Sequence, residues 1–461
     1  MDRRVGAKGY DRFGSSHLLP SERRAAVKKI GFWSVASIGV GGMVGGGIFA
    51  VLGLAVQMAK GGVPLAFFLS GVIALLTAYA YARLSVTYPS QGGTVEYLNQ
   101  AFGPGLLTGG LNVLLWLSYV VMLSLYAYAF GSYGKTFFPA GVQAVWKHVL
   151  ISAVVIVLTG LNVIGAKAVG RAEEWIVGIK VTILLLFIAF GLWSVQLRRL
   201  TPASWADPVS LFAGGMIIFL AYEGFELIAN TAQDVRTPHK TLPRAFYASV
   251  GFVIALYVLV SFVTAGNLPV AQIVAAKDYA LAEAAKPFLG DLGYTLIAVA
   301  ALMSTASAIN ASLYGAARVS YIIAKDGELP DFLEHKIWNR PLEGLVFTSA
   351  LTLLTANFLD LSSISMMGSA GFLLIFAAVN AANVRLHHKT GSQRWISVAG
   401  ALACLAALGA LVWRIAQNSP QKILLLVFML AAAFGLEIIY RSVSGRKLFS
   451  SATGTEAESA K

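Results

Sequence analysis

Charged residues are scarce in this sequence. Asp, Glu, Lys and Arg together make up 12% of its 461 residues, whereas hydrophobic residues make up 57%. Soluble domains of ordinary composition carry about twice this share of charge. The composition therefore excludes an ordinary water-soluble globular protein and predicts a chain whose main solvent is lipid.

Cysteine is almost absent, since Cys404 is the only one and lies in an apolar run. A disulfide within the chain is therefore excluded. The six histidines lie in tails, loops or at the ends of apolar runs, and none stands at a metal-binding spacing from cysteine or a carboxylate. We expect no metal, no cofactor and no catalytic residues, which disfavours an enzyme.

The alternation of apolar and polar residues that is typical of transmembrane β-strands is also absent. Apolar runs of about 20 residues are present instead, the length that a helix needs to cross the hydrocarbon core. The expected fold is one all-α bundle of twelve transmembrane helices, of which the ninth, residues 345–359, is short. The runs begin near Ile30, Gly61, Leu106, His148, Trp175, Pro208, Ala245, Leu292, Leu345, Leu361, Ile396 and Ile423.

Positive residues are distributed unevenly between alternate loops. With the N-terminus inside, 25 of the 35 Lys and Arg residues fall in inner segments and 9 in outer loops, while Lys180 lies within an apolar run. Positively charged loops stay on the cytoplasmic side. We therefore expect a multi-pass protein of the cell membrane with both termini in the cytoplasm. Its net charge of +13 then attracts anionic membrane lipids, and nucleic acid is not an expected partner.

The first apolar run contains an unusual concentration of glycine, with five glycines in residues 41–47. Each glycine costs about 0.5–1 kcal/mol relative to alanine in a helix interior, so a regular helix is disfavoured here. Two interpretations are open at this point. The glycines either let neighbouring helices approach closely or mark an unwound centre whose N–H groups bind an anion.

The sixth apolar run carries two carboxylates, Glu223 and Glu226, beside Gly224. At about 1.5 Å per residue, Glu223 lies roughly 16 Å from the boundary at Asp234, near the middle of a core of about 30 Å. This run is therefore predicted to be broken as well. Broken spans that stand five apart are the sequence sign of an inverted five-helix repeat with a substrate site between the breaks.

Several segments between residues 30 and 439 resemble motifs of the amino acid/polyamine/organocation (APC) transporters. The general motifs are residues 42–49, 88–93, 221–226 and 234–245, and residues 165–173, 284–290 and 324–330 look closest to sodium-independent, proton-coupled members. The family implies a fold like that of the leucine transporter. In this fold ten helices form two inverted repeats, two peripheral helices follow, and a central site is reached by alternating access.

The resemblance also implies a division of the chain and a function. The function is secondary active transport of amino acids, with proton-coupled symport expected and an amino acid or polyamine exchanger or a sodium-coupled symporter as alternatives. A channel is disfavoured because broken helices favour a closed site. The sequence indicates neither the amino acid nor the oligomeric state. The expected parts are a basic cytoplasmic tail (1–29), the first repeat (30–197), the second repeat (208–387), two peripheral helices (394–441) and a cytoplasmic tail (442–461).

An α-amino acid needs an anion site and a cation site a few ångströms apart. The N–H groups of Gly45, Gly46 and Gly47 at a positive helix end suit the carboxylate. Gly46 stands where relatives commonly have Ser, Thr or Ala, which leaves the substrate undefined. The carbonyls expected to bind the ammonium belong to Val40, Met43, Phe219 and Leu220, the last two at the end of the first half of the sixth helix.

Large and acidic side chains in the sixth run are candidates for selectivity. Phe219, Leu220 and Tyr222 either cover the site as a gate or pack in the core. Glu223 either binds a cationic end of the substrate or pairs within the bundle. Glu226 occupies a position that is often acidic in the family and linked to gating or proton handling, and a structural role at the helix end is the alternative.

Lys180 lies nine residues past Arg171, about 13 Å into the membrane along a straight helix. A lysine stem of roughly 6 Å does not return its amine to water, so the amine is paired, hydrated or neutral. The resemblance implies that Lys180 replaces the sodium ion of sodium-coupled relatives and couples transport to protons. A permanent helix-fixing ion pair is the alternative. Ser304 and Ser307 are its expected neighbours, unless they serve only in helix packing.

Overall fold

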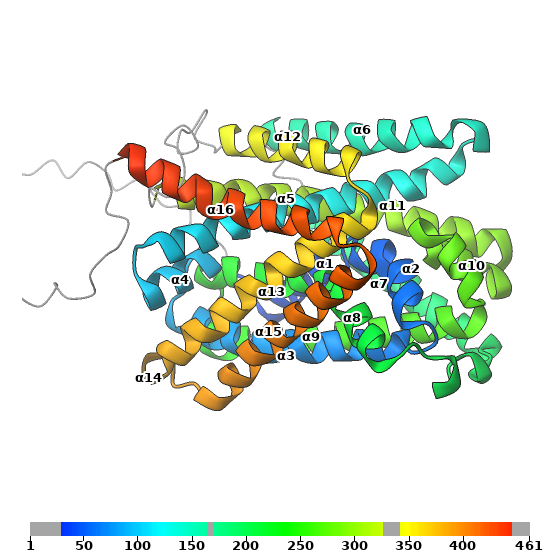
Figure 1. Ribbon diagram of the computed structural model, residues 1–461, viewed down its shortest axis with the longest axis horizontal. Coiled ribbons are helices and arrows are strands. Elements are labelled where there is room, and N and C mark those ends of the chain that lie inside the picture. The colour runs from blue at the N-terminus through cyan, green and yellow to red at the C-terminus, as the bar shows by residue number, and fades with distance from the viewer. Residues whose placement is uncertain (1–28, 165–168, 326–341, 445–461) are drawn as a thin grey trace, which may run out of the picture.

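Helices make up nearly all of the described chain (Figure 1). The computed structural model describes residues 29–164, 169–325 and 342–444, and within these ranges the only strand-like pairings are two isolated bridges. Nine helices of this part are long and apolar enough to cross a membrane, and two bent helix pairs raise the number to eleven. The prediction of an all-helical, multi-pass membrane protein is confirmed.

The predicted short ninth span corresponds to α12 (Leu342–Phe358). Its 17 residues make a helix of about 26 Å, somewhat shorter than a hydrocarbon core of about 30 Å. The helix packs against α6 (Gln143–Ile164), and the two run together along one edge of the bundle (Figure 1). Eleven of the twelve predicted spans thus meet the length requirement in the described chain.

Both predicted breaks are present. The first span consists of α1 (Phe32–Met43) and α2 (Gly47–Ala59), bent by 44°. The sixth consists of α8 (Pro208–Ile217) and η6 (Phe219–Asp234), bent by 41°. The second half, η6, is a 3₁₀ helix of 16 residues, although this helix type rarely exceeds one turn.

The two broken spans are paired at both ends. Ile30, before α1, forms a bridge with Val235, after η6, through the Ile30 N–H, which donates to the carbonyl of Asp234 at 2.9 Å. Lys60, after α2, forms a bridge with Trp205, before α8. The first bridge is parallel and the second antiparallel. The half-helices are therefore joined as α1 with η6 at one end of the bundle and α2 with α8 at the other.

The remaining helices surround these four halves (Figure 1). Long helices run across the view, with the short α4 and α14 at one end and α10 at the other. Their bounds are α3 (Val63–Thr87), α4 (Thr94–Phe102), α5 (Leu106–Gly134), η1 (Lys135–Phe137), η2 (Ala140–Val142), α7 (Val169–Gly191), η3 (Leu192–Ser194), η4 (Leu197–Arg199), η5 (Pro202–Ser204), α9 (Pro238–Asn267), α10 (Val270–Ala275), η7 (Lys277–Tyr279), α11 (Ala280–Lys325), α13 (Leu361–Arg385), α14 (His387–Thr390), α15 (Arg394–Asn418) and α16 (Gln421–Ser444).

Local sequence explains where two of these helices begin. At α8, the Asp207 side chain accepts the Ser210 N–H at 2.9 Å, and the Ser210 hydroxyl and N–H together lower the pKa of Asp207. In α11, two helical segments meet at Gly290, whose φ of +61° is rarely adopted by residues with a side chain. The predicted eighth span therefore begins just beyond this glycine.

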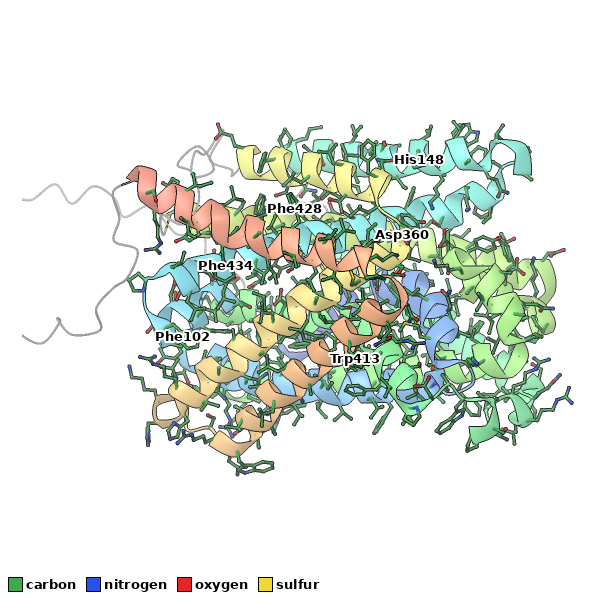
Figure 2. The ribbon with its side chains drawn as sticks, in the orientation of Figure 1. Phe102, His148, Asp360, Trp413, Phe428 and Phe434 are labelled. Atoms are coloured by element: carbon green, nitrogen blue, oxygen red, sulfur yellow. The ribbon has the colours of Figure 1, made fainter. Side chains whose placement is uncertain are left out.

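Large apolar side chains cover the outside of the bundle. Phe428 on α16 and Trp413 on α15 point away from the neighbouring helices, with 72% and 61% of their surface exposed (Figure 2). Such a surface suits contact with lipid, since it would be costly in water. Four segments of the sequence interpretation lie outside the described residues: 1–28, 165–168, 326–341 and 445–461.

Candidate functional site

The two breaks lie directly against each other. A Cβ atom added to Gly42 would stand 2.7 Å from the carbonyl oxygen of Gly224, and one added to Gly47 would stand 2.7 Å from the Cα of Ala221. Contacts this short leave room only for hydrogen, so glycine is required at these positions. The span is therefore both interrupted and closely packed, and the binding of an anion by its N–H groups stays a prediction.

Lys180 is buried at the first break. Its side chain is 1% exposed, and its Nζ donates to the carbonyl oxygen of Gly41 at 3.0 Å. The Ser304 hydroxyl on α11 donates to the carbonyl oxygen of Val44 at 2.8 Å. The structure thus brings Lys180 and Ser304 to the same break, where Lys180 bonds to the last turn of α1 and Ser304 to the residue that follows α1. Ser307, the other predicted neighbour, is buried on the same helix as Ser304.

Tyr257 on α9 connects the two breaks. Its hydroxyl donates to the carbonyl oxygen of Met43 at 2.6 Å and lies 3.4 Å from that of Ala221. Of the carbonyls predicted to bind an ammonium, that of Met43 therefore already accepts a hydrogen bond, and that of Val40 accepts the Val44 N–H at 2.7 Å. A carbonyl has a second lone pair, so both can still accept a bond from a ligand.

The second break begins earlier than predicted. α8 ends at Ile217 and η6 begins at Phe219, so the prediction that Phe219 and Leu220 end the first half of this helix is wrong by two to three residues. The Ile217 carbonyl accepts the hydroxyls of Ser365 at 2.6 Å and Ser369 at 3.0 Å, both on α13. These hydroxyls satisfy the backbone where the helix stops.

Two buried carboxyls lie beside the second break. Glu223 and Glu226 are each 1% exposed, and a 3₁₀ helix repeats every three residues, so both occupy one face of η6. Glu226 Oε2 accepts the Tyr81 hydroxyl at 3.0 Å and lies 3.4 Å from Thr94 Oγ1. Glu223 Oε1 lies 3.4 Å from the Tyr126 hydroxyl, and its Oε2 has no hydrogen-bond partner within the described residues. Buried carboxyls within a membrane are costly, which makes Glu223 and Glu226 candidates for a functional site.

The ring of Tyr126, on α5, covers the glycine-rich break. A Cβ atom added to Gly46 would overlap this ring, and one added to Gly45 would stand 3.5 Å from its Cζ. The same side chain reaches Glu223 with its hydroxyl. Tyr126 therefore occupies the space between the predicted anion site and the carboxyl, and it must move before a ligand can reach the N–H groups of the break.

The three large side chains predicted to form a gate are fully packed. The Tyr222 hydroxyl donates to the carbonyl oxygen of Phe67 at 3.0 Å, and the ring centroid of Phe219 lies 5.8 Å from that of Phe376. Leu220 is also buried. These contacts suit core packing, and gating by the three residues stays a prediction.

Comparison with known proteins identifies the family. The sequence profile of the amino acid permease family matches residues 30–441, which is most of the chain. The chain belongs to the amino acid permease family. This family is one of transporters, so the predictions of a membrane transporter and of a chain that is not an enzyme are confirmed.

Full-length relatives agree with this assignment. The permease is 37% identical over 424 residues to an uncharacterized protein of Methanocaldococcus jannaschii, covering 91% of this chain and 97% of the relative. It is 32% identical over 413 residues to the inner membrane transport protein YbaT of Escherichia coli, covering 89% and 96%. It is 24% identical over 392 residues to the methylthioribose transporter of Bacillus subtilis, covering 80% and 83%.

Sequence reasoning missed Tyr126 and Tyr257 of the permease. Both stand in long apolar spans, where a tyrosine looks like a packing residue. Their hydroxyls were the available signal, since a hydroxyl within a membrane needs a partner. Within the described residues, no three His, Cys, Asp or Glu side chains come together in a group that could hold a metal ion.

We expect Tyr257→Phe to lower the free energy of unfolding of the permease by about 1–2 kcal/mol, because it removes a hydroxyl shared by two buried carbonyls. Denaturant unfolding in micelles measures this loss. Tyr279→Phe, at a half-buried tyrosine away from the breaks, is the control and should change little. Equal stability of Tyr257→Phe and the wild type would mean that the hydroxyl does not hold the breaks together.

Proposed function

We propose that this permease moves amino acids across the cell membrane by alternating access around the paired breaks, as a proton-coupled symporter. The observation that carries the proposal is the backbone contact between the two breaks beside two buried carboxyls. The substrate carboxylate binds the N–H groups at Gly45, Gly46 and Gly47, at the positive end of α2. Its ammonium faces the carbonyls of the breaks and Glu223.

We further propose a leucine-transporter-like architecture of twelve spans, with α12 as the ninth. The repeats comprise residues 30–197 and 208–387, and residues 394–441 form two peripheral helices. The two terminal bridges support this division. Each joins a residue shortly before the broken span of one repeat to the residue just after the broken span of the other.

Proton coupling is assigned to Lys180. Its amine bonds to the unwound first span, and Ser304 bonds to a carbonyl three residues further on. Ser307 and Glu226 are assigned to the same proton-dependent network. The excess of positive residues in alternate loops supports a cytoplasmic position for both termini.

Counterflow in liposomes tests this function. Proteoliposomes are loaded with one amino acid or polyamine at a time, and the entry of the same labelled compound is measured. We expect accelerated entry for at least one amino acid, since a transporter that carries substrate changes its orientation across the membrane faster than an empty one. Absence of acceleration across the whole panel would contradict transport of amino acids. Entry into empty liposomes under a pH gradient separates symport from obligatory exchange.

We expect Glu223→Gln to shift substrate preference from cationic toward neutral amino acids by roughly tenfold or more, because a charge-assisted hydrogen bond is lost. Competition of unlabelled amino acids against counterflow measures the preference. Glu283→Gln removes a carboxylate from the surface pair with Lys286 and serves as the control. If Glu223→Gln keeps the wild-type profile, Glu223 is a structural residue.

A further inference from the structure

A groove of about 450 Å³ opens on the outer surface of the bundle, where α3 packs against α9 and α15. Its walls are apolar along most of their length: Val72, Leu75 and Leu76 come from α3, Gly251 from α9 and Ile396 from α15. Val72 and Leu75 are exposed on a helix that is apolar enough to cross the membrane. The groove therefore faces the hydrocarbon of the bilayer.

One end of the groove is polar. Tyr79 on α3 and Tyr247 on α9 line it there. The guanidinium of Arg83 lies 5.5 Å from the centroid of the Tyr79 ring. The Tyr79 hydroxyl accepts the backbone N–H of Gln393, just before α15, at 2.6 Å. This end thus has the aromatic and cationic character of the membrane–water interface.

Three exposed arginines stand at this same end, one on each helix. Arg83 follows Tyr79 by four residues on α3, and Arg244 precedes Tyr247 by three on α9, so each arginine shares a helix face with a groove tyrosine. Arg394 is the first residue of α15. In the proposed orientation this is the cytoplasmic side. The groove therefore combines an apolar trough with a cluster of positive charge at its inner end.

We propose that this groove, the α3–α9–α15 groove, binds an anionic phospholipid of the inner leaflet. An acyl chain lies along Val72 and Leu75, and the phosphate is held by Arg83, Arg244 and Arg394. Hydrocarbon is the occupant that the bilayer supplies to such a trough, and the planar guanidinium group matches a phosphate with two parallel hydrogen bonds. Charge complementarity selects an anionic head group over a zwitterionic one.

The position of the groove connects it to the breaks. α3 and α9 both pack against η6, which carries Glu223, and α9 carries Tyr257 ten residues beyond Tyr247. A lipid in the groove would therefore contact two helices that support the site, and the site itself would stay formed without it. Binding of the lipid is consequently testable separately from transport.

Competition binding tests the proposal. The purified permease in micelles is offered phosphatidylglycerol and phosphatidylcholine with identical acyl chains, and bound lipid is counted by native mass spectrometry. We expect the wild type to prefer phosphatidylglycerol and each of R83Q, R244Q and R394Q to lower this preference by roughly fivefold. R198Q, on η4 at the opposite end, is the matched control and should keep the preference.

A second pair of variants tests the trough. A side chain added at Gly251 would enter open space in the groove, and Gly160 on α6 has equally open surroundings outside it. We expect Gly251→Leu to lower binding of both lipids about fivefold and Gly160→Leu to have no effect. The proposal is overturned if the wild type shows no head-group preference, if the arginine variants keep it, or if the two glycine variants behave alike.

Discussion

Gly46→Val is expected to abolish substrate binding, with affinity lowered at least about a hundredfold. A Cβ atom at this position would overlap the Tyr126 ring and stand 3.1 Å from Cγ2 of Thr305. A branched side chain would thus fill the space that a substrate carboxylate must enter to reach the N–H groups of the break. Equilibrium binding of a labelled amino acid that passes the counterflow test measures the loss.

The control must separate a blocked site from a misfolded protein. Gly160→Val places the same side chain in open space on α6, and it should bind substrate like the wild type. Gly46→Val should remain monodisperse, because the side chain that must yield is that of Tyr126 and not backbone. Wild-type affinity in a monodisperse Gly46→Val protein would rule out the substrate site at this break.

The position of the first break could be predicted from local sequence. Glycines that disfavour a helix concentrate at residues 41–47, and α2 begins at Gly47. The position of the second break could not be predicted to the residue. α8 can end at Ile217 because the hydroxyls of Ser365 and Ser369, 148 and 152 residues away along the chain, satisfy the Ile217 carbonyl. The sequence around residue 217 contains no pattern that indicates these two serines as partners.

The burial of Lys180 was also predictable, because its distance from Arg171 along the helix exceeds the reach of a lysine side chain. Its partner was less so. The sequence indicated Ser304 or Ser307, a contact that stays a prediction, but it did not indicate the carbonyl of Gly41, to which the amine donates. Every residue type supplies a backbone carbonyl. The sequence therefore does not indicate which carbonyl at a break accepts a hydrogen bond.

The position of Tyr126 was also not predictable from the sequence. Tyr126 fills the space between Gly46 and Glu223, and this follows from the packing of α5 against the breaks. Its sequence context is that of an ordinary buried aromatic residue. Only the three-dimensional arrangement therefore identifies Tyr126 as a residue of the candidate site.

Lys180→Ala is expected to uncouple uptake from the pH gradient while substrate still binds. The Lys180 amine donates to the carbonyl of Gly41, and in the proposed mechanism its protonated form holds α1 against α7, as a bound sodium ion is expected to do in sodium-coupled relatives. Release of the proton to the inside weakens this attraction and favours opening of the inner side. Proton binding and substrate binding then shift the same equilibrium between two conformations of the bundle, which is the condition for coupling.

Initial uptake rates in proteoliposomes measure this coupling. An inward proton gradient should accelerate wild-type uptake about tenfold without sodium, and it should change Lys180→Ala uptake less than about twofold. Lys147→Ala, which removes a partly buried lysine paired with Asp278 on a different helix, is the matched control and should keep the wild-type response. A sodium requirement in the wild type, or full pH-driven uptake in Lys180→Ala, would show that Lys180 is a fixed structural charge and that coupling resides elsewhere.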